Sequence, residues 1–396
     1  MKTATVTWIT YRNYGTVLQA YALQNSIASF GYQNEILSDE EILRVFRAEH
    51  PFTGKKPYPV ESVETKTAAD RVFSLIRSPR KLQRSIQAHF HPKSFGKPFT
   101  AAQKAISDFV SQELLVRTDV AIENLARLNS EYDAFICGSD QIWSVFPMNF
   151  NPYYFLDFAN KAKISYAPSL GTERLPPEIL AGLQTLLRGF QALSVREQRS
   201  AEQLSSLLQR DVACVCDPTL LRDRQFWECF ATPVPKKHKR YLLCYFLESR
   251  KWYYDYAEAV AKKHHLSILL LPNCWDHLGR TYVDTSTICP RTFVARFRDA
   301  SYVLTDSYHG SIFSMLFEKD FQYLLRFRPD DKESQNIRVL SLFERLGILD
   351  KIVDESTAGR NIAPIDYSRV RQRIADFRTD SVTFLQNSLA SIDHSL

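Results

Sequence analysis

The chain has 396 residues and a formal net charge of +6; 45% of its residues are hydrophobic and 24% are charged. This length predicts two domains, and the composition is that of a folded globular protein rather than of a disordered one. No apolar run is long enough for a transmembrane helix, and the first residues are more typical of a β-strand than of a signal peptide. We therefore expect a cytoplasmic protein.

The first part of the chain predicts a β-α-β unit. Residues 4–9 are typical of a strand, and residues 17–30 carry apolar side chains at helical spacing. Gly31 follows where a helix commonly ends, and the next strand begins at residue 34. Because a crossover of this kind joins parallel strands, the sequence predicts a parallel sheet.

Residues 40–115 are predicted to form a basic, mostly helical insertion. Residues 41–110 contain 13 basic and six acidic side chains, a net charge of +7. The segment carries no known nucleic-acid-binding module, so no nucleic-acid partner is expected. Two alternatives stay open for it. It is a solvated helical surface, or it makes peripheral contact with an anionic membrane through residues 44–104, at the inner face of the cell membrane.

The remainder of the chain alternates between predicted strands and helices. The strands are expected at residues 132–137, 162–167, 192–195, 212–216, 241–247, 267–271, 302–305 and 321–325. The helices are expected at residues 197–209, 251–264, 291–299, 310–318, 336–346 and 366–390. This alternation predicts two α/β domains, residues 1–200 and 201–365, that face each other across a cleft, followed by a helical tail, residues 366–396.

The cysteines predict neither disulfides nor a metal site. All seven are expected to be free thiols, because their number is odd and most lie in apolar, strand-like segments. Cys214 and Cys216 have the wrong spacing for a zinc site and no histidine nearby. We therefore expect no bound metal.

Four loops are candidates for the functional site, because ligands of open parallel sheets bind beyond the carboxyl ends of the strands. Two of them lie in the first domain and offer groups suited to a hydroxyl-rich ligand such as a sugar. The residues concerned are Asn13, Tyr14 and Gly15, before a helix N-terminus, and Ser139, Asp140, Gln141 and Trp143, after a strand. Asp140 can also accept a proton from a sugar hydroxyl. The structural alternatives are a tight turn at residues 13–16 and a helix cap at Asp140.

The other two loops offer groups for an anion. Arg196 ends a predicted strand, and its planar guanidinium suits a carboxylate or a phosphate. His309 opens a predicted helix, where Gly310 and Ser311 can present backbone N–H groups to a phosphate. The alternatives are a plain ion pair between Arg196 and Glu197 and a structural role for His309.

Six motifs in order carry a resemblance to a known family. They are TYRNYGT (10–16), GSDQIW (138–143), YAPSLG (166–171), VRE (195–197), DPTLL (217–221) and TDSYHG (305–310). With these motifs the chain resembles the polysaccharide pyruvyl transferase family. The resemblance implies a GT-B-like fold of two Rossmann-like domains, with a C-terminal helix that crosses back to the first domain.

The resemblance also implies an activity. The donor is phosphoenolpyruvate, a co-substrate that needs no further cofactor, and the acceptor is a glycan or lipid-linked oligosaccharide of capsule, exopolysaccharide or cell-wall synthesis. Two sugar hydroxyls take up the pyruvate unit as a ketal, and phosphate is released. His309 and Asp140 are the expected catalytic residues. The expected donor-binding residues are Arg196, Ser307, Tyr308, Gly310, Ser311 and Lys319.

One departure concerns the donor, because relatives often have Arg-Leu-His where this chain has Ser307, Tyr308 and His309. Two alternatives therefore stay open. One is a nucleotide-sugar glycosyltransferase of the same shape. The other is a non-catalytic glycan-binding protein of an envelope assembly complex.

Overall fold

The structure of the protein is a computed structural model. It describes residues 1–11, 13–49, 97–145, 150–234, 240–284, 286, 288–328, 331 and 334–393. The predicted basic insertion begins with helix α2 (Glu40–Glu49) and ends with helix α5 (Lys97–Glu113). Most of the region predicted to contact a membrane, and Arg12 of the TYRNYGT motif, lie outside the described residues.

The first domain is built on a parallel sheet with the strand order β3-β2-β1-β4-β5. The two-stranded sheet β6-β7 continues it beside β5, through a bridge between Ile164 and Ala192. The strands are β1 (Lys2–Val6), β2 (Gln33–Leu37), β3 (Val116–Arg117), β4 (Ala134–Cys137), β5 (Ala162–Ser165), β6 (Ser194–Val195) and β7 (Ala213–Cys214). The other helices are α1 (Tyr14–Ser29), α6 (Pro177–Leu187), α7 (Gln198–Leu208), η1 (Ile122–Ser130) and η2 (Pro152–Phe155).

The central strand ends earlier than the sequence predicted. A strand was expected over residues 4–9, whereas β1 ends at Val6. The register of β1 with β4 ends at the pair Val6 and Cys137, and one more hydrogen bond follows it, from Gly138 N–H to Val6 O. Residues 7–11 therefore lie in a loop at the carboxyl edge of the sheet, and Trp8 belongs to this loop.

The second domain repeats the same design. Its parallel sheet has the order β12-β11-β10-β8-β9. The strands are β8 (Tyr241–Tyr245), β9 (Ser267–Leu271), β10 (Tyr302–Thr305), β11 (Phe321–Leu324) and β12 (Ile352–Val353). The helices are α8 (Pro218–Leu221), α9 (Arg224–Phe230), α10 (Lys251–His264), α11 (Pro290–Asp299), α12 (Tyr308–Leu316), α13 (Ile337–Leu346), η3 (Trp275–Gly279), η4 (Leu349–Lys351) and α14 (Tyr367–Asp393).

The boundary between the domains lies later than residue 200, where the sequence placed it. Strand β7 pairs with β6 of the first domain, in the register Ser194 with Ala213 and Val195 with Cys214. Leu204 of α7 and Val212 are buried in the core of the first domain. The chain therefore enters the second domain only after β7.

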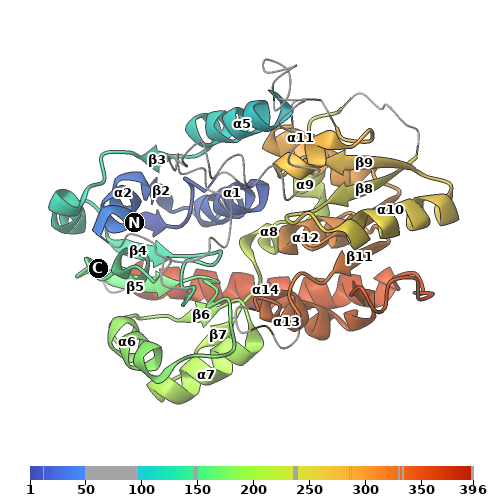
Figure 1. The fold of residues 1–396 in the computed structure, drawn as a ribbon. Helices are drawn as coiled ribbons and strands as arrows, with labels where there is room; N and C mark the ends of the chain where they lie inside the picture. Colours follow the sequence, from blue (N-terminus) through green and yellow to red (C-terminus); the bar gives the residue numbers. More distant parts are fainter. Residues whose placement is uncertain are drawn as a thin grey trace, which may run out of the picture.

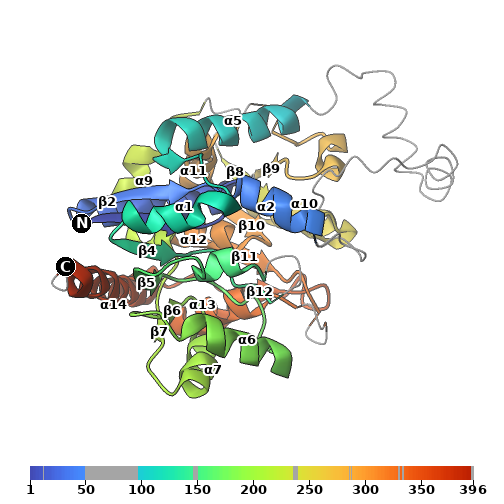
Figure 2. The ribbon, with the colours of Figure 1, turned by 90° about the vertical axis from the view of Figure 1, so that its left-hand side faces the viewer.

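The two domains are joined on two sides. Helix α14 runs from the second domain beneath the five-stranded sheet of the first, above α6 and α7 in the view, and α5 lies on the opposite side of that sheet (Figure 1). Figure 2, turned by 90°, also shows α5 and α14 on opposite sides of the first sheet. Ser381 of α14 accepts the hydrogen bond of Cys216 N–H at the crossover between the domains (2.8 Å), and Arg291 of α11 makes an ion pair with Glu113 of α5 (2.9 Å).

One buried apolar cluster extends across both domains and includes side chains from α1, α8, α11, α12 and α14. The architecture is therefore α/β with two Rossmann-like domains, GT-B-like, closed by a C-terminal helix that returns to the first domain. Within the part of the chain that the structure describes, every helix is too short or too polar to span a bilayer.

Candidate functional site

The predicted histidine lies where the two domains meet. His309 is in the first turn of α12, directly after β10, and it is buried. Ser307 begins this helix as its N-cap, with its hydroxyl accepting a hydrogen bond from Gly310 N–H (3.2 Å). His309 Nε2 lies 3.3 Å from Asp217 Oδ2, so the two side chains form an ion pair when the imidazole is protonated.

Asp217 connects the histidine with the predicted arginine. Its Oδ2 accepts a hydrogen bond from Arg196 Nη1 (2.7 Å), and its Oδ1 accepts from Thr219 N–H and hydroxyl (3.0 and 2.7 Å). Burial alone would raise the pKa of this carboxyl, but His309 and Arg196 hold the pKa well below its ordinary value. Asp217 is therefore an anion held between the guanidinium of Arg196 and the imidazole of His309.

Arg196 is enclosed rather than exposed to a cleft. Its guanidinium stacks on the ring of Tyr308 at 4.4 Å and contacts Glu197 at 3.4 Å, in addition to Asp217. The side chain is 1% exposed, and its Nη2 has no hydrogen-bond partner. Burial raises the pKa of the neighbouring Glu197. The ion pair named as an alternative to anion binding is thus present, and one N–H group of Arg196 is left over.

The loop at residues 13–16 approaches His309 from the first domain. Asn13 caps α1 by accepting a hydrogen bond from Gly15 N–H (2.9 Å). Gly15 lies so close to His309 that a Cβ atom here would be 2.1 Å from His309 Nδ1. Tyr14 stacks on Phe293 at 4.4 Å, and its hydroxyl donates to Ile288 O (3.0 Å). Tyr14 thus holds the domains together, and Gly15 provides the space for the histidine.

The loop at residues 138–143 contributes Asp140 and Gln141. Asp140 Oδ2 accepts a hydrogen bond from the Thr16 hydroxyl (2.7 Å), which fixes the carboxylate beside the first turn of α1. Gln141 Nε2 donates to Gln335 Oε1 of the second domain (2.9 Å), and Arg338 donates to the same oxygen (3.1 Å). These contacts bring Asp140 and Gln141 to the domain boundary, where the other candidate residues lie.

Two residues of that loop do not face the domain boundary. The Trp143 side chain is fully buried, stacked on Phe155 (5.2 Å), and its Nε1 donates to Tyr154 O. Ser139 is also fully buried, with its hydroxyl donating to Ala167 O (2.6 Å). The prediction that Trp143 and Ser139 contact a sugar is therefore wrong for this structure, because both side chains are committed to the core.

Lys319 was predicted on the donor side, but it lies at the opposite end of α12 from His309. It follows the last turn of that helix and precedes β11, at the amino edge of the sheet. A nine-residue helix spans about 13 Å, so Lys319 does not reach the histidine. The Gly310 and Ser311 amides lie beside His309, but both donate to Ser307, to its hydroxyl and its carbonyl respectively.

The carboxylate of Asp306 binds the backbone of the loop after β8 and is not directed at a ligand. Its carboxylate accepts hydrogen bonds from Leu247 N–H (2.6 Å) and Glu248 N–H (3.0 Å), and burial nevertheless raises its pKa to about 6. Because the folded state holds the proton more tightly than the unfolded state, this group lowers the free energy of unfolding as pH rises from about 4 to 6.

We expect Asp306→Asn to remove that dependence. Relative to the variant, the wild-type protein should lose about 3 kcal/mol of stability between pH 4 and pH 7, measured by urea unfolding at both values. The amide retains an oxygen that can accept one of the two backbone bonds. Equal changes in the two proteins would show that this carboxyl titrates at its ordinary pKa.

We expect Asp217→Asn to destabilise the fold by about 3–5 kcal/mol, because it removes the shorter ion pair of the buried Arg196 and leaves the longer contact with Glu197. Urea unfolding at pH 7 measures the effect. Asp223→Asn is the matched control: Asp223 caps α9 in the same way but is exposed and bonds only Phe226 N–H, so asparagine can replace it with little loss. Similar losses in the two variants would mean that Asp217 is only a helix cap.

Asp217, Glu197 and Gln335 were not assigned to the site from the sequence. Asp217 precedes a proline and a threonine, a pattern that also begins an ordinary helix, so its contact with His309 is not visible in the sequence. Gln335 lies in the loop before α13, and its contact with Gln141 comes from the way in which the domains pack.

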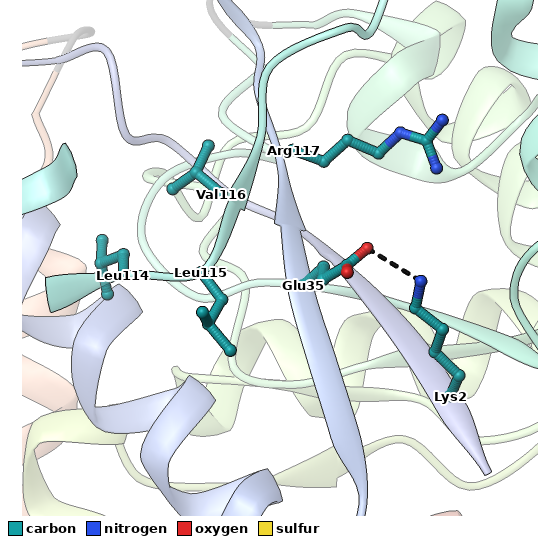
Figure 3. A pocket seen from close by; sticks show the side chains of 6 residues that line it. All are labelled: Lys2, Glu35, Leu114, Leu115, Val116 and Arg117. Atoms are coloured by element: carbon teal, nitrogen blue, oxygen red, sulfur yellow. Dashed lines mark ion pairs between the residues drawn. The ribbon is translucent and has the colours of Figure 1, made fainter. Parts of the chain in front are cut away.

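A separate hollow lies at the other edge of the first sheet. A cavity of about 420 Å³ is lined by Lys2, Glu35, Leu114, Leu115, Val116 and Arg117 (Figure 3). Lys2 begins β1, so this hollow is at the amino edge of the sheet, away from His309. Among the described residues, no group of three or more His, Cys, Asp or Glu side chains is arranged to hold a metal.

The fold and this site define a two-domain α/β protein whose candidate residues come from both domains. The model of the family described as Polysaccharide pyruvyl transferase matches residues 13–321. The chain belongs to the polysaccharide pyruvyl transferase family. The match includes the loops that carry Gly15, Asp140, Arg196 and His309. No curated protein sequence matches the chain.

Several solved structures are similar over nearly the whole chain. An Escherichia coli heptosyltransferase, WaaC, is 14% identical (TM-score 0.38; 95% of this chain and 99% of the other). A putative UDP-N-acetylglucosamine 2-epimerase from Listeria monocytogenes is 8% identical (TM-score 0.45; 98% and 91%). The glycosyltransferase SsfS6 of Streptomyces sp. SF2575 is 11% identical (TM-score 0.39; 96% and 96%).

Proposed function

We propose that the protein transfers the pyruvate unit of phosphoenolpyruvate to two hydroxyls of a glycan sugar, forming a ketal and releasing phosphate. One observation carries the proposal: His309 and Arg196 share the carboxylate of Asp217 at the junction of the two domains, beside the first turns of α1 and α12. The guanidinium of Arg196 and two helix N-termini favour an anionic substrate. Family membership supports transfer of a pyruvyl group.

In the proposed reaction His309 is the general acid. It donates a proton to the methylene carbon of phosphoenolpyruvate, which leaves an oxocarbenium ion at the adjacent carbon. Asp217 is positioned to stabilise the imidazolium before this transfer, at 3.3 Å from Nε2.

Asp140 is the proposed base for a sugar hydroxyl. The first hydroxyl attacks the oxocarbenium carbon and gives up its proton to Asp140. The second hydroxyl then displaces phosphate: the carbon–oxygen bond that closes the ketal replaces the one that breaks, and the proton of this hydroxyl leaves with the phosphate. Asp140 Oδ2 accepts the hydroxyl of Thr16, so a sugar hydroxyl would take the place of an existing donor at this oxygen.

Arg196 and the start of α12 are the proposed anion-binding groups. Nη2 of Arg196 is buried, so it can donate to a carboxylate or a phosphate once the groups that enclose it move, without breaking the bond to Asp217. The Gly310 N–H can donate to phosphate if the Ser307 hydroxyl turns away from it. Ser307 and Tyr308 thus have indirect roles, as the helix cap and as the surface beneath the guanidinium.

A thermal-shift titration tests the proposal. Phosphoenolpyruvate and a panel of uridine, guanosine and adenosine diphosphate sugars are titrated into the wild-type protein and His309→Ala. A ligand that binds only the native state raises the melting temperature with concentration. We expect a shift with phosphoenolpyruvate that is weaker in the variant. A shift with one nucleotide sugar and none with phosphoenolpyruvate would replace pyruvyl transfer by glycosyl transfer.

A further inference from the structure

An aromatic pair lies in the loop that follows β1. The ring centroids of Trp8 and Tyr11 are 5.8 Å apart, with 40° between the ring planes. Both side chains are partly exposed, unlike Trp143 and Tyr14. Because β1 is the central strand of the first sheet, its carboxyl end places the pair at the edge where the candidate site is found.

The pair is held from behind by buried groups. The edge of Tyr154 packs against Trp8 at 6.4 Å, with 78° between the rings. The Tyr154 hydroxyl donates to Asp39 Oδ2 (2.8 Å), and Asp39, which follows β2, is fully buried. Burial raises the pKa of Asp39, and hydrogen bonds from Tyr154 and Thr10 act in the opposite direction. A ring fixed in this way loses little freedom when a ligand binds to it.

The same loop connects the aromatic pair with the histidine. Asn13, which precedes α1, lies near enough to Tyr245, the final residue of β8 in the second domain, to influence the pKa of its hydroxyl. Tyr11 is also near enough to influence the pKa of Tyr245. Two residues after Asn13, Gly15 packs against His309. The aromatic pair is thus only a few residues from Gly15, which contacts the proposed general acid His309 of the second domain.

We propose that Trp8 and Tyr11 form the platform that binds the pyranose ring of the acceptor; this assignment rests on the function proposed above. A pyranose has apolar C–H faces and a rim of hydroxyls. An aromatic ring offers a large, rigid apolar face, and the hydroxyl of Tyr11 and the amide of Asn13 offer polar groups beside it. The rings of Trp8 and Tyr11 therefore take the role of apolar sugar-binding surface that the sequence had assigned to Trp143, which is buried in the core.

Saturation-transfer NMR on the full chain tests the platform. The probes are methyl β-D-glucopyranoside, methyl β-D-galactopyranoside, cellobiose and lactose, with UMP and ADP as nucleotide probes. In Trp8→Ala we expect saturation transfer to the sugar C–H protons to fall about fivefold or more, whereas Trp8→Phe retains it. Trp252→Ala is the matched control, because Trp252 is a partly buried tryptophan on α10 of the second domain.

Tyr11→Ala is the second variant, for the case in which Trp8→Ala does not fold, and it should also weaken transfer. Unchanged transfer in both variants, no transfer to any of the four sugars, or transfer to the nucleotides alone would overturn the platform. Binding of phosphoenolpyruvate, followed by its ³¹P signal in the same samples, should change less than about twofold. Sugar binding without phosphoenolpyruvate binding would contradict the proposed function and leave the platform standing.

Discussion

Replacing His309 by alanine should lower kcat for phosphate release from phosphoenolpyruvate by about 10²–10⁴-fold, the usual contribution of a general acid. The fold should persist, because the alanine removes a partner of Asp217 but leaves its bonds to Arg196 and Thr219. Steady-state release of inorganic phosphate in the presence of a glycan acceptor measures the effect.

His264→Ala is the control for this experiment. His264 ends α10, is exposed, and stacks on Tyr302 at 5.0 Å, so its loss should leave phosphate release unchanged. If His309→Ala retained near-normal turnover, another group would have to supply the proton, and the role assigned to His309 would be withdrawn.

Replacing Gly15 by alanine should destabilise the protein by about 1–3 kcal/mol, because the new methyl group would overlap the ring of His309. The overlap lies between domains, so relief requires the domains to separate or the imidazole to move away from Asp217. Either response should also reduce phosphate release. Urea unfolding gives the stability, and the activity assay gives the second effect.

A double-mutant cycle separates the clash from other causes. In the His309→Ala background the ring is absent, so Gly15→Ala should cost much less than it does in the wild type. Gly182→Ala is the matched control on α6, where the added methyl would lie 3.7 Å from Phe150, an ordinary contact. That change should be neutral or stabilising by up to about 1 kcal/mol. Equal costs of Gly15→Ala in both backgrounds would exclude the contact with His309 as their cause.

The fold was largely predictable because most elements carry strong local patterns. The strands at residues 267–271 and 302–305 and the helix at 251–264 have the bounds that the sequence predicted. The two-residue strands β3 and β12 were not predicted, since so short a segment has no periodicity to detect. Helix α6 was also missed, although it carries an apolar pattern: Leu183 and Leu187 are buried, and Ile179 and Leu186 pack against the same core.

The candidate site was predictable only in part. His309, Arg196, Asp140 and Gly15 each follow a strand, in the next loop or in the first turn of the next helix, and a parallel sheet brings such segments to one edge. Asp217 was missed because its partners depend on the packing of the two domains. Trp143 was misassigned because a tryptophan after a polar loop gives no sign in the sequence of whether it points outward or into the core.

Helix α14 has a consequence for the order in which the protein is made. Its 27 residues follow the strands of both sheets in the chain, yet Ser381 accepts the hydrogen bond of Cys216 N–H, next to Asp217, and Arg378 donates to Leu220 O. During synthesis both sheets can form while the backbone on either side of Asp217 still lacks these partners. The junction that holds His309 and Arg196 is therefore completed only after α14 has been made.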